Sequence, residues 1–173
     1  DEFSSIIAKN LDKFRVRNYG VPGYSTLQSL LLYDELENAS VKSRKLVVLG
    51  FSDHHGSRNV ASDSWLMRLK MASNRHEWIS TPYARINGEG DLQIYPPKEY
   101  QKWPFSEYSV ILQQMQLAYS SQIDRKLKGQ QETVTFQILE KMASNIARDG
   151  NEFLVLVMRA KKSARQRYLK KFD

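Results

Sequence analysis

The positions of the hydrophobic residues predict a chain in which strands alternate with helices. Around Leu27 and Leu30 the apolar side chains fall near helical spacing, whereas residues 44–51 and 152–158 are short apolar runs typical of buried parallel strands. The same patterns predict further helices over 3–13, 106–127 and 132–148 and a short strand over 14–18. Together they favour the α/β class, with three αβα layers and a mostly parallel sheet.

Residues 65–104 depart from this alternation because several prolines and glycines there break up any long element. Residues 83–86 and 92–95 flank Asn87-Gly88-Glu89-Gly90 and predict a β-hairpin within an inserted segment. Such a segment is either a lid over a site or a structural excursion that caps the sheet. We otherwise expect residues 1–173 to form a single domain, because a chain of this length with 41% hydrophobic residues supports one core.

The stretch Asn18-Tyr19-Gly20-Val21-Pro22-Gly23-Tyr24-Ser25-Thr26 predicts a turn from the strand at 14–18 into the helix at 27–36. Thr26 is a candidate N-cap of that helix. Two glycines let the backbone turn sharply and leave a main-chain N–H available to an incoming oxygen, as in many anion sites. A tight connection without function uses the same residue types, so both interpretations stay open.

A second polar loop follows the strand at 44–51. Parallel strands end at the same sheet edge, so we expect this loop to lie near residues 18–26. Imidazole suits proton transfer near neutral pH, and arginine and asparagine suit the binding of an oxyanion or carboxylate. The alternative is a solvated turn with a side-chain cap. The chemistry-bearing candidates are Ser52, Asp53, His54, His55, Arg58 and Asn59.

Metals, cofactors and membrane spans find no support in the sequence. Asp53, His54 and His55 do not predict a zinc site, because adjacent histidines tend to point apart and no further ligand cluster follows. The chain has no phosphate loop with its lysine, no Gly-x-Ser-x-Gly elbow and no cysteine. No run of about 18 apolar residues predicts a transmembrane helix. We therefore expect no cofactor and no membrane span.

The net charge of +7 is concentrated near one end of the sequence. Residues 159–171 carry seven basic and no acidic side chains, and the rest of the chain is balanced. In this segment Ala160, Ala164, Tyr168 and Phe172 recur every four residues and predict an amphipathic helix. It is either a surface helix with a solvated basic face or a patch for nucleic acid or an anionic membrane. Without a nucleic-acid motif or interleaved aromatics, we expect no nucleic-acid partner.

Two blocks of the sequence resemble the SGNH/GDSL hydrolase family of flavodoxin-like ester hydrolases and acyl transferases. Residues 18–26 match its second block, Asn-x-Gly-x-x-Gly-x-(Ser/Thr)-Thr, and residues 46–53 resemble its third, a strand that ends Gly-x-Asn-Asp. The resemblance implies that Gly23 supplies a backbone oxyanion donor. Ser52 stands where the family has its oxyanion asparagine, with Arg58 or Asn59 as substitutes, and Asp53 keeps the aspartate of the block.

The Gly-Asp-Ser and Asp-x-x-His blocks of that family do not occur in these residues. The resemblance therefore implies the central portion of an SGNH-like domain, with the nucleophilic serine and catalytic histidine outside this chain and with His55 as the fallback base. It also implies a missing sheet strand, supplied by the rest of the protein or by another chain. The expected activity is hydrolysis or transfer of an acyl group, such as acetyl, from a small-molecule or carbohydrate ester, and these residues alone are expected to be inactive. The alternative is a non-catalytic α/β module that binds carbohydrate or protein.

Overall fold

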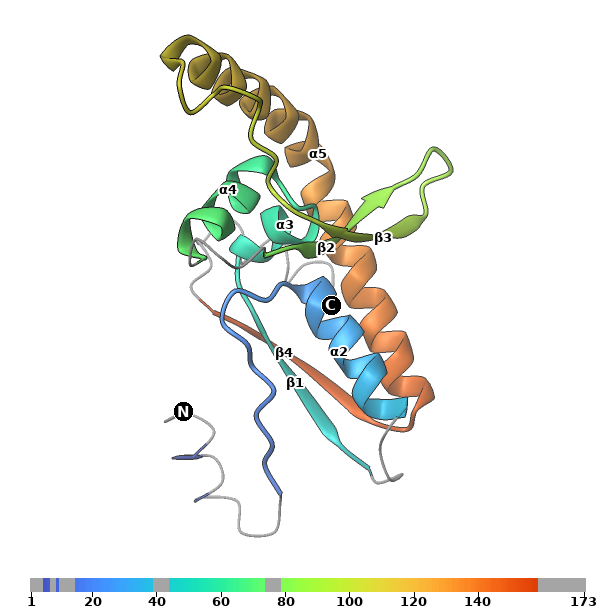
Figure 1. The fold of residues 1–173 in the computed structure, drawn as a ribbon. Helices are drawn as coiled ribbons and strands as arrows, with labels where there is room; N and C mark the ends of the chain where they lie inside the picture. The colour runs from blue at the N-terminus through green and yellow to red at the C-terminus, as the bar shows by residue number, and fades with distance from the viewer. Residues whose placement is uncertain (1–4, 7–8, 10–14, 39–43, 74–78, 159–173) are drawn as a thin grey trace.

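The computed structural model describes residues 5–6, 9, 15–38, 44–73 and 79–158 (Figure 1). In this part, helices are mixed with two small sheets, one parallel and one antiparallel. The basic segment 159–171 and most of the helix expected at 3–13 lie outside the described residues. The elements are α2 (Thr26–Asn38), β1 (Leu46–Phe51), α3 (His54–Asn59), α4 (Asp63–Ala72), β2 (Thr81–Ile86), β3 (Leu92–Lys98), α5 (Val110–Arg148) and β4 (Glu152–Val157).

Strands β1 and β4 form the parallel sheet. Leu46 pairs with Glu152 and Phe51 with Val157, so the two strands run in register over their whole length. The predicted strands at 44–51 and 152–158 are thus confirmed as a parallel pair. A parallel pair needs a crossover connection, and the chain between them includes α5, which packs back against β4.

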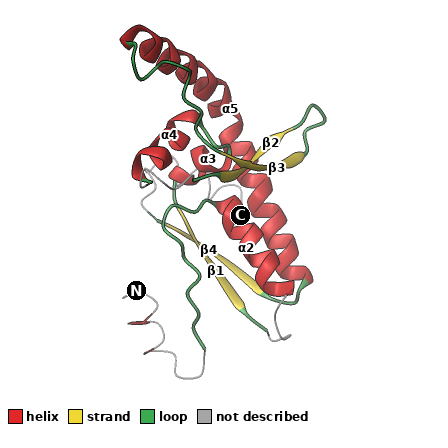
Figure 2. Ribbon diagram, viewed as in Figure 1, coloured by secondary structure: helices red, strands yellow, loops and turns green. Residues whose placement is uncertain are grey.

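The core lies between this sheet and the helices α2 and α5 (Figure 2). Leu27 and Leu30 of α2 meet Leu49 of β1 and the apolar positions of the C-terminal half of α5. Helix spacing brings these side chains to one face of each helix, as the sequence predicts for 27–36 and 132–148. The residues of α5 that enter the core are Val134, Ile138, Leu139, Met142 and Ile146.

The other face of the parallel sheet is open within the described residues. Side chains alternate along both strands, so Leu46, Val48, Leu154 and Leu156 are exposed while their neighbours pack on the core. The sequence predicts buried strands, but in the described part of the chain alternate residues of both strands are exposed on this face. Helices α2 and α5 supply one covering layer, and the third layer of the expected αβα fold is not among the described elements.

The strand predicted at 14–18 is not a strand. Its described residues, 15–18, form no sheet pairing and belong to an irregular stretch that runs to residue 21 (Figure 1). The alternation of apolar and polar residues fits a strand, but a strand also needs a neighbour to accept and donate its backbone hydrogen bonds. Among the described strands β1 pairs with β4 alone, and none pairs with this stretch.

The two helices predicted at 106–127 and 132–148 are one helix of 39 residues, α5. The predicted break falls near Gly129, where the helix continues and a side chain would meet nothing within 4 Å. A glycine inside a helix costs only about 1 kcal/mol relative to alanine. The lysines and glutamines on either side are good helix formers, so the helix continues through Gly129.

In the described part of the chain no helix is apolar enough over a sufficient length to cross a membrane.

The predicted hairpin is confirmed as the antiparallel pair β2 and β3. It packs into the body of the molecule, because Ala84 is buried in the core and the amide of Gln137 on α5 donates to the carbonyl of Gly90 at 2.9 Å. The start of the expected segment 65–104 falls inside α4. That helix is capped by Ser62, whose hydroxyl accepts from the N–H of Trp65 at 3.3 Å.

Candidate functional site

The two polar loops singled out by the sequence lie against each other in the structure. The hydroxyl of Thr26, at the start of α2, lies 2.9 Å from Nδ1 of His55 on α3. The N–H of Leu27 donates to the side-chain oxygen of Asn59 at 3.0 Å. Both bonds are buried and join residues about thirty positions apart, so α2 and α3 hold the ends of the two loops together next to the carboxyl end of β1.

The first loop is built by local hydrogen bonds. The side chain of Asn18 accepts from the N–H of Gly20 at 2.8 Å, and the N–H of Tyr24 donates to the carbonyl of Val21 at 3.1 Å. Gly23 sits in that turn with φ +90°, a conformation that strains any residue with a Cβ. A Cβ there would lie 4.0 Å from the Trp65 ring, so the backbone angle rather than lack of space requires glycine.

The helix that follows is capped by Ser25 and not by Thr26. The N–H of Ser25 donates to the side chain of Gln28 at 2.9 Å, and the N–H of Gln28 lies 3.5 Å from the Ser25 hydroxyl. This reciprocal pair is a capping box, and its signature, Ser-x-x-Gln at 25–28, is present in the sequence. The Thr26 hydroxyl instead forms its hydrogen bond with His55.

The N–H of Gly23 is the distinctive donor of the first loop. Within the described residues it donates to no acceptor, although Gly23 is only partly exposed. An unused backbone N–H in a constrained turn is suited to bind an anionic or carbonyl oxygen. The structure therefore keeps available the donor on which the sequence-based hypothesis depends.

Arg58 and Trp65 flank the same turn. One guanidinium nitrogen of Arg58 donates to the carbonyl of Tyr24 at 3.0 Å, and the guanidinium carbon lies 4.4 Å from the centre of the Trp65 ring. Burial, and then the nearby Arg68, lower the pKa of Arg58 from its ordinary value. The Nε of Arg58 and the Nε1 of Trp65 are buried and have no hydrogen-bond acceptor among the described residues. Trp65 was not a candidate from sequence, because nothing local signals that it packs on Arg58.

His55 is buried and neutral. Only 8% of its surface is exposed, and its ring meets the Phe51 ring edge-on at 5.2 Å. Burial, followed by the charges of Arg58 and His54, lowers the pKa of His55 from 6.5 to about 4. A histidine with so low a pKa is a weak base at neutral pH, so the geometry suits His55 for holding α3 against α2.

Asn59 is also used inside the molecule. It is completely buried, and while its oxygen accepts from Leu27, its nitrogen donates to the hydroxyl of Thr135 on α5 at 3.0 Å. The side chain thus ties three helices together and has one donor and one acceptor already engaged. Thr135 was missed from sequence because its role depends on a contact across 76 positions.

Ser52 and Asp53 occupy the turn between β1 and α3, and both are partly exposed. The Ser52 carbonyl accepts from the N–H of His55 at 3.0 Å, and its hydroxyl lies 3.4 Å from the N–H of His54. Asp53 is the N-cap residue of α3 but makes no side-chain cap bond there. The hydroxyl hydrogen of Ser52 is free to rotate, so this residue can accept from the backbone and donate to a ligand.

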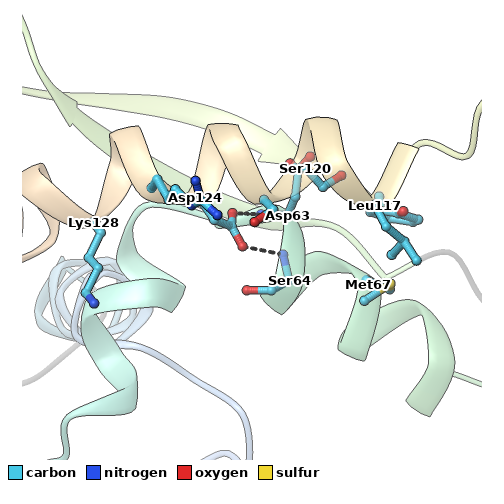
Figure 3. A pocket seen from close by; sticks show the side chains of 10 residues that line it. Asp63, Ser64, Met67, Leu117, Ser120, Asp124 and Lys128 are labelled. Atoms are coloured by element: carbon cyan, nitrogen blue, oxygen red, sulfur yellow. Dashed lines mark hydrogen bonds between the residues drawn. The ribbon is translucent and has the colours of Figure 1, made fainter. Parts of the chain in front are cut away.

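A groove lies between α4 and α5 (Figure 3). Its volume is about 330 Å³, and none of the predicted site residues line it. The Asp124 carboxylate in this groove accepts from the N–H groups of Asp63 and Ser64 at 2.8 and 3.1 Å, so it caps α4. Asp63 is paired in turn with Lys98 at 3.5 Å. The acids of the groove thus have structural partners.

Among the residues that the structure describes, no three metal-binding side chains gather at one place. No protein-family model matches the chain, and neither a curated protein nor a solved structure does. The function is therefore argued from the geometry of the two loops.

Proposed function

We propose that these residues form the oxyanion-binding part of an SGNH-like site that hydrolyses or transfers an acyl group from a small-molecule or carbohydrate ester. The observation that carries the proposal is the unused N–H of Gly23, held by a turn with φ +90° beside α3. The resemblance to the family also lies in this turn, in β1 and in the residues that follow β1. The same two segments meet in the structure through the Thr26–His55 and Leu27–Asn59 bonds.

In the proposed reaction a serine outside this chain attacks the acyl carbon and a histidine outside it accepts the serine proton. The carbonyl π electrons move onto oxygen, which then carries a negative charge. The N–H of Gly23 and the hydroxyl of Ser52 donate to that oxygen. When the tetrahedral intermediate collapses, the alcohol leaves with the proton, and water or an acceptor alcohol then takes the acyl group from serine.

The remaining candidates have supporting roles in this proposal. Arg58 holds the Tyr24 carbonyl and thereby the turn that carries Gly23. Asn59 and His55 fix α3 against α2 through their buried bonds. Asp53 stays at the start of α3, where its negative charge is favourable. The proposal assigns the oxyanion to Gly23 and Ser52 and not to Asn59, because the Asn59 amide is already engaged in the core.

The proposal also includes completion of the fold to a flavodoxin-like, three-layer domain. A strand carrying the nucleophile would pair with the edge of β1 that has no partner among the described strands and would offer residues 15–18 a neighbour. A further layer would cover the exposed Leu46, Val48, Leu154 and Leu156. The free strand edge supports the additional strand, because unpaired edges expose backbone hydrogen-bonding groups. The open apolar face supports the additional layer, because apolar surface in contact with water is unfavourable.

A non-catalytic binding module is the second candidate, and one observation favours it. Within the described residues no nucleophile is paired with a base of suitable pKa, since His55 is buried, has a pKa of about 4 and contacts Thr26. A module of this kind would use the same two loops to bind carbohydrate or protein.

Turnover of p-nitrophenyl acetate by the full-length protein that contains these residues separates the two candidates. We expect Ser52→Ala to lower kcat about 10²–10³-fold with little change in KM, which is the usual effect of losing one oxyanion donor. Ser57→Ala is the matched control, because the Ser57 hydroxyl only donates to the His54 carbonyl within α3. Absence of turnover in the unsubstituted protein, or equal effects of the two changes, would contradict the enzyme proposal.

A further inference from the structure

The N-terminal part of α5 extends beyond the rest of the molecule (Figures 1 and 2). Apart from Gln116, the buried residues of α5 begin only at Val134. Residues 108–123 contain no charged side chain, although 26% of the whole chain is charged. An exposed helix without charge is unusual, because charged side chains normally cover such a surface.

Large apolar side chains form a stripe along this part of the helix. Ile111, Met115 and Tyr119 are 74%, 54% and 52% exposed and follow one another at intervals of four residues. Residues four apart lie above one another on a helix and form a ridge. Gln116 lies off this ridge and faces the preceding loop, where it accepts from the N–H of Trp103 at 3.2 Å and donates to the carbonyl of Gln101 at 3.0 Å. Ile111 and Met115 are exposed to solvent, and about half of the Tyr119 surface stays exposed although its ring centre lies 5.6 Å from that of Trp103 in this loop.

The composition of the ridge fits a protein surface better than a membrane surface. Compared with the rest of a protein surface, protein interfaces are depleted in charged residues and enriched in aromatic residues and methionine. Helices that lie on membranes carry lysine or arginine along the polar face. The polar positions of residues 108–123 are glutamines and serines, with no basic side chain among them.

We propose that the ridge of Ile111, Met115 and Tyr119 packs against the same ridge of a second copy of this chain, with the two helices antiparallel. A two-fold axis requires the middle of the ridge to meet itself, so Met115 faces Met115 and Ile111 faces Tyr119. This inference does not depend on the enzymatic proposal, because it uses none of the residues of the loop site.

Charge favours the antiparallel arrangement. Arg125, Lys126 and Lys128 follow the uncharged stretch, next to the capping carboxylate of Asp124. A parallel pair would place these basic side chains against their own copies. An antiparallel pair keeps these basic side chains away from their own copies and places them near the other end of the stretch, where Glu107 and Lys102 neutralise each other at 2.6 Å.

The exposed apolar side chains at this end of the molecule set the largest area that such an interface could bury. The aromatic side chains at this end, Phe105, Tyr108 and Tyr119, are 74%, 88% and 52% exposed. An aromatic side chain buries roughly 150–250 Å² when covered, so these three offer roughly 400 Å². The exposed aliphatic residues, Val110, Ile111 and Met115, raise this toward the roughly 800 Å² per partner of a stable interface.

Disulfide trapping tests the proposed axis directly, because the chain has no cysteine of its own. We expect Met115→Cys to form a disulfide-linked dimer under mild oxidation, at least tenfold faster than Met71→Cys. Met71 is the control because it is 78% exposed on α4 and lies outside the ridge. Equal rates for the two variants would overturn the proposal.

Sedimentation equilibrium gives an independent measurement. We expect the unsubstituted chain to dimerise and Met115→Glu to weaken the dimer at least tenfold, whereas Gln114→Glu, which adds the same charge beside the ridge, changes it little. Circular dichroism checks that both variants fold. A monomer at all concentrations, a dimer indifferent to Met115→Glu, or binding to phosphatidylserine vesicles by a monomer would each overturn the proposal, and the last would assign the ridge to a membrane surface.

Discussion

Gly23 and Gly90 have nearly the same backbone φ angle but very different surroundings. Their φ angles are +90° and +91°, and each lies in a tight turn. In the hairpin turn the N–H of Gly90 donates to the Asn87 carbonyl at 3.2 Å, and its carbonyl accepts from Gln137. The N–H of Gly23 has no acceptor among the described residues. A left-handed glycine is thus no sign of function by itself; the distinction lies in the backbone group that the turn leaves unused.

The anchors of the two turns differ in the same way. Asn87 holds the hairpin turn by accepting from the N–H groups of Glu89 and Asp91 at 3.0 and 2.8 Å, all within five residues. The loop with Gly23 is held from outside, by Arg58 on α3 and by the buried Asn59–Leu27 bond at the start of α2. The hairpin turn adds one bond from Gln137 of α5 to its local bonds, whereas the site loop adds to its own local bonds contacts that depend on three helices.

The largest expected change in the free energy of unfolding follows from removal of the Asn59 side chain, which anchors the start of α2. Asn59→Ala leaves the buried N–H of Leu27 without its acceptor, which costs about 1–3 kcal/mol. It also removes the amide that donates to the Thr135 hydroxyl, although that hydroxyl still donates to the Gln131 carbonyl at 2.7 Å. We expect the free energy of unfolding to fall by about 3 kcal/mol in urea denaturation. Asn87→Ala, in the exposed hairpin turn, should cost about 1 kcal/mol. Equal losses would mean that the two turns are anchored alike.

The pH dependence of stability should reveal the buried His55. Its pKa is about 4 in the folded protein and 6.5 when unfolded, so between these values the unfolded chain binds more protons. The contribution of His55 to the free energy of unfolding is therefore fully present above pH 6.5. It falls by about 3 kcal/mol as the pH drops to 4 and is then constant. Urea denaturation across this range should show the slope in the unsubstituted chain and lose it in His55→Gln. His54→Gln, at an exposed position, is the control and should keep the slope.

A smaller loss of stability is expected when the two glycines are substituted. Replacing either Gly23 or Gly90 by alanine places a Cβ at positive φ and should cost about 1–2 kcal/mol. Thermal unfolding should show similar losses for both variants, because neither Cβ meets an atom closer than 4.0 Å. A much larger loss for Gly23→Ala would mean that tight packing, rather than the backbone angle, requires that glycine.

Much of this comparison was accessible from the sequence. The hairpin around Asn87-Gly88-Glu89-Gly90 and the parallel strands β1 and β4 follow from local patterns, and the structure has them. The two polar loops also meet as expected, although one of the two strands from which this was predicted, at 14–18, is not a strand. These features rest on residue types and spacing within short windows. The capping box at Ser25 and Gln28 was equally readable but was assigned to Thr26 instead.

Other features depend on contacts that no short window contains. The alternation at 14–18 resembles a strand, yet the described residues offer it no pairing partner. Gly129 resembles a helix end, yet its small cost is outweighed within a long helix whose other half is packed in the core. Trp65 and Thr135 became part of the site only because α4 and α5 bring them against Arg58 and Asn59.

The most direct test of the central claim is to observe the Gly23 N–H when an oxyanion forms beside it. Full-length protein labelled with ¹⁵N-glycine would be treated with a p-nitrophenyl phosphonate, which leaves a tetrahedral anionic adduct on a reactive serine. The account predicts that the Gly23 amide proton moves strongly downfield as it donates to the phosphonyl oxygen, while the Gly90 signal stays in place. Absence of a serine adduct, or an adduct that leaves the Gly23 signal unchanged, would contradict it.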